Sequence, residues 1–304
     1  MENQCLGLAA AMGLVPVVKR VSLRAPWRQL SPTFLRLGLA HALAADSDRL
    51  DPPWPDVAIA TGRQSVAASL FLRQVNPGTF RIQIQNPGVR SSLFDLVVVP
   101  RHDRLRGNNV ISTLGSLHGV TPQATADAAA RMAPQFDHLP RPRVAVLVGG
   151  SNGAYRLDKT VMADFAGRLA DMARKDGVGL MVTPSRRTGA ENEQVLRDAL
   201  AGLPATIWDG EGENPYFALL GLADAIIVTA DSVNMVTEAC STGKPVMVAG
   251  LPGGSRKFDD FHRALLADGL TRPFDGRLEN WAYQAPDDTA FVAAEAWRRF
   301  YARS

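Results

Sequence analysis

The chain is poor in cysteine, and it lacks long apolar runs, internal repeats and low-complexity tracts. Its two cysteines, Cys5 and Cys240, are far apart and have no metal-ligand spacing. Few cysteines suit a reducing compartment, with both thiols as small core residues. No apolar run approaches the roughly 20 residues of a membrane span, and residues 1–4 are not the start of a signal peptide. We therefore expect a cytoplasmic protein.

Neither positive nor negative charge strongly predominates. The formal net charge is +3 and the isoelectric point is about 9.1. The arginines are scattered along the chain and form no dense basic run, so a nucleic-acid partner is not expected. The mild positive balance leaves open phosphorylated ligands and a peripheral contact with the anionic surface of the inner membrane.

The chain has enough length and apolar content for two α/β domains. Its 304 residues are 46% hydrophobic, which favours two buried cores over one. Short apolar runs alternate with amphipathic stretches, as in domains with parallel sheets. The alternation restarts at Arg143 after a segment with three prolines, residues 134–142. We predict Rossmann-like domains at 1–138 and 139–304 with a cleft between them, and a last helix packing back on the first domain.

The first half opens on a helix where a domain of this type normally has a strand and a glycine turn. Residues 5–12 are rich in leucine and alanine, so we expect the first sheet to lack its usual opening strand. An apolar stretch at 15–21 predicts a strand, and Ser31-Pro32-Thr33 predicts the start of a helix over 34–44. Further strands are expected at 55–63, 81–85, 95–99 and 108–114, and helices at 65–73 and 122–132.

A histidine and an aspartate follow the expected strand 95–99. His102 and Asp103 lie just past its end, where functional loops are found. Because imidazole exchanges protons near neutral pH, this pair is the candidate for general acid–base catalysis. A solvated or structural loop histidine is the commoner alternative.

A glycine turn follows the apolar strand 143–148. Its residues are Gly149, Gly150, Ser151 and Asn152. Glycine lets a backbone approach a phosphate or sugar closely, and the two polar side chains can hydrogen-bond it. The turn is neither a P-loop nor a dinucleotide fingerprint, since it lacks the GK[ST] element and the second spaced glycine. By itself it is weak support for a nucleotide.

Two arginines follow the next expected strand, residues 180–183. Ser185, Arg186 and Arg187 lie in the turn after it. Guanidinium groups with hydroxyl neighbours suit a diphosphate. A solvated turn is the alternative.

The stretch 213–250 reads as helix, strand, polar turn, helix and strand. Asn214 can begin the first helix, and 225–229 is an apolar run typical of a buried parallel strand. In such a βαβ unit the ligand crevice lies at the carboxyl ends of the strands. The residues at or soon after that end are Asp231, Ser232, Met235 and Glu238. The Glu238 carboxylate can accept from ribose hydroxyls, whereas a helix cap and a solvated carboxylate are the bland alternatives.

Four segments together resemble a known family. They are GGSNGA (149–154), TPSRRTGAE (183–191), ENPYFALLGLADAIIVTADSVNMVTEACSTGKPV (213–246) and FDLVVVPRHD (94–103). They are similar to a family of bacterial and plant proteins named after a plant mitochondrial-fission factor, over nearly the whole chain. The resemblance implies a glycosyltransferase-like architecture of two Rossmann domains, the GT-B type. It also implies that residues 232–238 lie where such enzymes hold nucleotide ribose and phosphates.

These observations favour transfer of a sugar from a nucleotide diphosphate sugar to an acceptor that the sequence does not identify, such as a lipid-linked or cell-envelope molecule. Ser151, Arg186 and Arg187, with helix N-termini, can stabilise the leaving diphosphate without a metal. No cofactor is therefore expected. Two alternatives stay open: a non-catalytic nucleotide-sugar-binding or membrane-recruitment protein, and a sugar-nucleotide epimerase or hydrolase.

Overall fold

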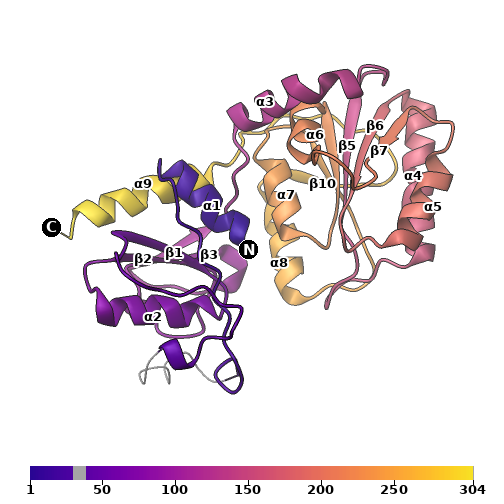
Figure 1. The fold of residues 1–304 in the computed structure, drawn as a ribbon. Coiled ribbons are helices and arrows are strands. Elements are labelled where there is room, and N and C mark those ends of the chain that lie inside the picture. Colours follow the sequence, from indigo (N-terminus) through magenta and orange to yellow (C-terminus); the bar gives the residue numbers. More distant parts are fainter. Residues whose placement is uncertain (30–38, 304) are drawn as a thin grey trace. The chain divides into compact units, whose positions relative to one another are not determined.

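The structure is a computed structural model that describes residues 1–29 and 39–303. The chain forms two compact units (Figure 1). Unit 1 contains Met1–Gly119 together with Asp287–Ser304, and unit 2 contains Val120–Pro286. The expected α/β fold with two parallel sheets is confirmed.

Unit 1 is built on a four-stranded parallel sheet in the order β1-β2-β3-β4. The strands are β1 (Val57–Thr61), β2 (Phe80–Ile84), β3 (Leu96–Pro100) and β4 (Val110–Thr113). In the register, Ile82 lies opposite Leu96 and Val98 opposite Ile111. Most residues of these strands are apolar, which suits a parallel sheet that is covered on both faces. The charged exception is Arg81 of β2, which pairs with Asp95 at 2.8 Å.

Three helices cover this sheet. Alternate residues of β3 show which face each helix covers. Leu96 and Val98 pack in one cluster with residues of α1 (Glu2–Ala11) and α9 (Asp288–Tyr301). Val97 and Val99 pack in another cluster with residues of α2 (Ser65–Val75). The helices α1 and α9 therefore lie on one face and α2 on the other (Figure 1).

Two expectations for the first half need correction. Residues 15–21 form no strand, and Val15 and Val17 are almost fully exposed. An apolar stretch becomes a strand only beside a partner that takes its backbone hydrogen bonds. In the described chain this region has isolated backbone contacts and no ladder: Asp48 N donates to the Arg20 carbonyl at 3.0 Å, and Leu23, just beyond the region, forms an isolated bridge with Leu43. The helix expected over 34–44 lies mostly outside the described residues, and its described end contains a short 3₁₀ helix, Leu39–His41.

Unit 2 is built on a six-stranded parallel sheet in the order β10-β9-β8-β5-β6-β7. The strands are β5 (Arg143–Val148), β6 (Gly179–Pro184), β7 (Ala205–Ile207), β8 (Ala225–Thr229), β9 (Val246–Ala249) and β10 (Thr271–Pro273). The chain runs outward from β5 in one direction and, from β8 onward, in the other. This is the strand order of a Rossmann fold, in which ligands bind at the carboxyl ends beside the reversal point.

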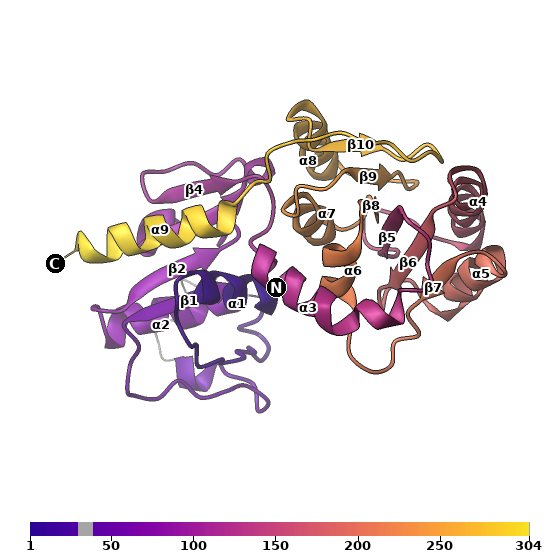
Figure 2. The same ribbon diagram turned by 90° about the horizontal axis from the view of Figure 1, so that it is seen from above.

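Helices cover both faces of this second sheet (Figure 2). On one face lie α4 (Lys159–Asp176) and α5 (Ala190–Leu200), and on the other α6 (Tyr216–Leu222), α7 (Val233–Cys240) and α8 (Arg256–Ala267). Neither α8 nor β10 is expected from the sequence. Five of the twelve residues of α8 are charged and only Phe261 and Leu265 are fully buried, so its apolar stripe is narrow.

Capping residues fix where the main helices begin and end. The α3 helix (Pro122–Met132) has proline at its first position, and the Thr121 side chain accepts from a first-turn amide. Asp158 caps α4 in the same way, and Gly177 ends it with φ +65°. Such a local signal explains why the sequence predicts α3 closely.

The boundary between the units differs from the expected one. It falls at Gly119 rather than near residues 134–142, because α3 packs on α6 in unit 2. A Cβ at Gly221 of α6 would lie 2.4 Å from the Thr125 carbonyl oxygen of α3, so glycine permits this close approach. Over the described residues, none of the helices has both the length and the apolar character needed to cross a membrane.

Candidate functional site

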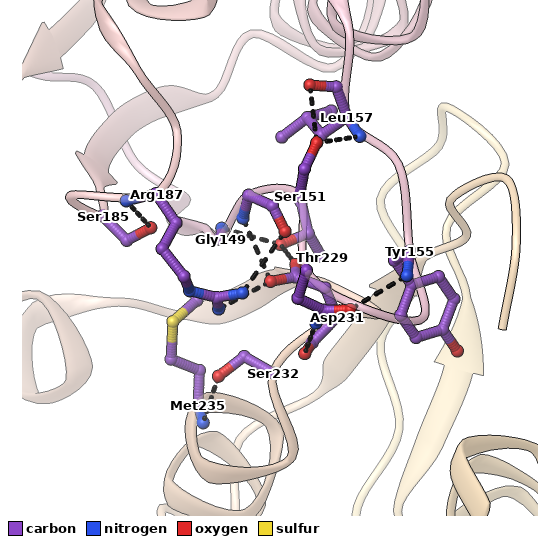
Figure 3. A network of polar contacts seen from close by, with 12 residues as sticks. Gly149, Ser151, Tyr155, Leu157, Ser185, Arg187, Thr229, Asp231, Ser232 and Met235 are labelled. Carbon is purple, nitrogen blue, oxygen red and sulfur yellow. Dashed lines mark hydrogen bonds and ion pairs between the residues drawn. The ribbon is translucent and has the colours of Figure 1, made fainter. Parts of the chain in front are cut away.

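The carboxylate of Asp231, directly after β8, joins three turns at the carboxyl ends of unit 2's strands (Figure 3). The side chain is fully buried. One oxygen accepts from Thr229 Oγ1 at 2.7 Å, and the other from Gly150 N at 3.0 Å. That second oxygen also pairs with the Arg187 guanidinium at 2.7 Å. A buried charge persists where it is paired and hydrogen-bonded in this way.

The glycines of the turn after β5 are required by close packing of the protein itself. A Cβ at Gly149 would lie 2.2 Å from the Asp231 carboxylate, and one at Gly150 would lie 2.0 Å from the Arg187 carbonyl oxygen. The Gly149 amide donates to Thr229 Oγ1 at 2.8 Å. Both glycine amides are therefore committed to the network, which differs from the expected direct role at a phosphate.

The two polar residues after the glycines shape the turn. Ser151 Oγ accepts from Leu157 N at 2.8 Å. Asn152 Oδ1 accepts from Tyr155 N at 2.9 Å, and its Nδ2 donates to the Asp231 carbonyl at 3.1 Å. These bonds leave residues 151–153 exposed at the rim of the sheet.

A pocket of about 420 Å³ lies beside this turn, lined by Asn152–Arg156 with Pro252 and Gly253. It exists because the loop after β9 pairs with the turn, through Gly254 N to the Ala154 carbonyl at 2.8 Å. A Cβ at Gly253 would lie 2.3 Å from the same carbonyl oxygen. The hollow is shallow and open to solvent, so its volume alone does not indicate a ligand.

The two arginines after β6 have different environments. The guanidinium of Arg187 is 43% exposed and points at Asp231, while its backbone N–H donates to Ser185 Oγ at 3.2 Å. Arg186 is exposed. Thr188 Oγ1 fastens this turn to the one after β5 by donating to the Gly149 carbonyl at 2.5 Å. The expected pair is thus one anchored and one solvated arginine.

The N-terminus of α7 lies next in the chain. Ser232 is its capping residue, and its Oγ accepts from Met235 N at 3.3 Å. First-turn amides of a helix lack partners within the helix and carry partial positive charge. They are suited to an anion, together with Arg187 and the exposed turn at 151–153.

From the sequence alone, we expect the Glu238 side chain to point outward and to have no protein partner. The structure differs, because Tyr216 is hydrogen-bonded to it. Its Oε2 accepts from Tyr216 Oη at 2.5 Å. Burial raises the pKa of the Glu238 carboxyl to about 7, although the Tyr216 hydrogen bond acts in the opposite direction. Burial also raises the pKa of Tyr216 well above its usual range. Asn214 holds the tyrosine backbone, accepting from Tyr216 N at 3.0 Å.

The candidate acid–base pair lies in unit 1. His102 and Asp103 belong to the 3₁₀ helix Arg101–Asp103 that follows β3. Their side chains are only 3% and 11% exposed, and Nε2 lies 3.9 Å from Oδ1. A general base must come within hydrogen-bond reach of its substrate. In this structure the two buried side chains are not accessible to a substrate.

Sequence reasoning misses four residues around the site. Thr229 is the last residue of β8, and Thr188 lies in the turn after β6, directly after the predicted Arg187. The rule that ligand sites follow strand ends could have found both. Tyr216 bonds Glu238, and His262 Nε2 lies 2.8 Å from the Ala230 carbonyl. These two are on helices whose sequences carry no signal for such contacts.

Among solved structures, the chain is similar to a UDP-GlcNAc 2-epimerase from Neisseria meningitidis bound to UDP-GlcNAc. The TM-score is 0.48 at 14% identity, covering 81% of this chain and 76% of that one. It is also similar to the glycotransferase of kitacinnamycin, with a TM-score of 0.46 at 17% identity over 95% of this chain and 82% of that one.

Comparison of the sequence with known proteins identifies a family and two relatives. The pattern of the family described as mitochondrial fission ELM1 matches residues 1–300. The mitochondrial fission protein ELM1 of Arabidopsis thaliana is 31% identical over 303 residues, covering 88% of this chain and 71% of that protein. An uncharacterized protein of Rickettsia prowazekii is 24% identical over 285 residues, or 81% of this chain and 80% of that one. The resemblance inferred from the motifs is confirmed, and the chain belongs to the mitochondrial fission ELM1 family.

Proposed function

We propose that unit 2 binds the nucleotide diphosphate of an activated sugar and that the chain is a GT-B-like glycosyltransferase. The observation that supports this proposal is the Asp231 network. Three turns at the reversal point of a Rossmann sheet are held together by one buried carboxylate. A site that is organised before the ligand arrives loses less free energy to ordering when it binds.

The diphosphate has complementary groups at the rim of this network. The N-terminus of α7, the exposed turn at 151–153 and Arg187 surround one edge of the sheet. Arg186 adds exposed positive charge near the same strand ends, and the exposed Arg156, which pairs with Asp158 at 3.1 Å, lies in the turn after β5. Positive groups held in place at a leaving diphosphate stabilise the charge that develops as the sugar departs. This arrangement supplies leaving-group stabilisation from side chains and helix amides.

The ribose is assigned to Glu238. An ionised carboxylate accepts hydrogen bonds from neighbouring hydroxyls, and the short helix α7 keeps this residue within two turns of Ser232. For the acceptor hydroxyl, His102 with Asp103 remains our proposed base. Its use requires the His102 ring to become accessible from its buried position.

Incubation with UDP- and GDP-sugars, with and without lipid-linked acceptors, tests the proposal. A transferase consumes the donor only when an acceptor is present and releases the nucleoside diphosphate. Donor isomerisation or hydrolysis without acceptor would replace transfer by epimerase or hydrolase chemistry, and binding without turnover would indicate a recruitment protein. His102→Gln should abolish transfer and leave nucleotide affinity unchanged, because His102 lies outside unit 2.

A further inference from the structure

Tyr216 and Glu238 form a polar pair inside unit 2 that the network around Asp231 does not include. The tyrosine begins α6, and the glutamate lies in α7. The hydroxyl donates to Glu238 Oε2 at 2.5 Å. The short distance fits a bond to a charged acceptor.

The tyrosine is itself held in place. Its backbone N–H donates to Asn214 Oδ1 at 3.0 Å, and its ring lies against Phe217 with the ring centroids 6.1 Å apart. A tyrosine with a fixed backbone and a packed ring has few rotamers left. It can therefore restrict the side chain that it contacts.

We propose that Tyr216 is a positioning residue, which holds the Glu238 carboxylate in the one orientation that presents Oε1 to the hydroxyl groups of a nucleoside ribose. This role rests on the proposed nucleotide site. A carboxylate has about four lone-pair positions on its two oxygens, and Tyr216 occupies one of them on Oε2. The ribose contact is then made chiefly by one oxygen rather than by both.

The same hydrogen bond favours the charge state that the ligand needs. Burial raises the pKa of Glu238 to about 7, and the Tyr216 hydroxyl acts against that rise. Loss of the hydroxyl should raise the carboxyl pKa further, so less of the ionised acceptor exists at neutral pH. Within the described part of unit 2, Tyr216 is the titratable side chain bonded to this carboxylate.

The test compares Tyr216→Phe with Tyr283→Phe. Tyr283 Oη makes a bifurcated hydrogen bond to the backbone carbonyls of Cys240 and Lys244, at 3.0 and 2.6 Å, at the C-terminal end of α7. Both variants lose one buried hydroxyl, yet only Tyr216→Phe touches Glu238. Affinities for UDP and GDP are measured by calorimetry from pH 6 to 9, with Glu238→Gln alongside.

We expect Tyr216→Phe to weaken binding roughly tenfold at pH 7, because a hydrogen bond to a charged group is lost. The midpoint of its affinity–pH curve should move to higher pH. Tyr283→Phe should lower the melting temperature without moving that midpoint. An unmoved midpoint and unchanged affinity in Tyr216→Phe, while Glu238→Gln binds weakly, would overturn the positioning role and leave the proposed function standing.

Two further results separate the claims. If wild-type protein binds neither nucleotide, the proposed function fails and the positioning role fails with it. If wild-type protein binds and Glu238→Gln binds as tightly, the ribose role of Glu238 and the positioning role fail while the nucleotide site stands. Carbon-13 NMR of the Glu238 carboxyl in the wild-type chain needs neither ligand nor variant. A titration midpoint near 7 supports the burial of this carboxylate, whereas one near 4.5, the ordinary value, contradicts it.

Discussion

Asp231 is the residue on which the candidate site depends most. Its carboxylate has no exposed surface and receives hydrogen bonds from Gly150, Thr229 and Arg187. The sequence predicts Asp231 at the site because it follows an apolar strand. It cannot show that the side chain turns inward, because that depends on donors from two other turns and from the end of β8.

Replacing Asp231 by asparagine should destabilise unit 2 by about 3 kcal/mol. The amide removes the negative charge that pairs with Arg187 and places an N–H₂ group among donors, so a buried network is left partly unsatisfied. Asp171→Asn is the matched control, since Asp171 is exposed and pairs with Arg174 at 3.4 Å. It should cost less than about 1 kcal/mol. Urea unfolding measures both, and equal losses would contradict the role of the network.

Ionisation of Glu238 should lower the stability of the fold and favour ribose binding, so the two quantities should change with pH in opposite directions. Its folded-state pKa, about 7, is above the ordinary 4.5. The folded chain therefore holds the proton more tightly, and its stability falls as pH rises from 4.5 through 7. Glu238→Gln should remove that fall, which is on the order of 1–3 kcal/mol. Unfolding free energies measured at pH 5 and pH 8 check this, and a wild-type chain equally stable at both, with the variant unchanged, would contradict it.

At the scale of elements, the sequence predicts those whose signals are local. The apolar run at 225–229 and the capped helix after Thr121 form as expected. Residues 15–21 have a similar apolar pattern but no strand beside them, so they stay irregular. The pairing of Tyr216 with Glu238 escapes prediction for the same reason, because it depends on how α6 and α7 pack.

The turn after β5 offers a direct test of element packing. Gly150→Ala should destabilise the chain by at least about 2 kcal/mol, because its Cβ would lie 2.0 Å from the Arg187 carbonyl oxygen and the turns must separate. Gly153→Ala in the same turn is the control, since its Cβ meets nothing within 4 Å. Thermal unfolding compares them. A Gly150→Ala variant as stable as Gly153→Ala would show that the turns are not closely packed.

At the scale of the whole molecule, the two units share one chain that crosses between them twice. Unit 1 combines the first 119 residues with the C-terminal helix, and unit 2 is continuous. The prolines between residues 134 and 142 suggest a domain boundary from the sequence. The boundary in the structure is set by tertiary packing instead, because α3 packs against α6 of unit 2. The proposed nucleotide site lies wholly in unit 2, and the proposed base lies in unit 1.

The central claim is that unit 2 binds a nucleotide diphosphate at the carboxyl ends of β5, β6 and β8. Calorimetric titration of UDP and GDP into the full chain and into Arg186→Gln tests it most directly, with Arg174→Gln as a control that removes another exposed arginine of unit 2. We expect saturable binding of at least one diphosphate, several-fold weaker in Arg186→Gln and unchanged in Arg174→Gln. Ligand at 100 times its dissociation constant should also stabilise the fold by about 2.7 kcal/mol. If neither nucleotide gives a binding heat in calorimetry or stabilises the fold, the proposed nucleotide site is contradicted.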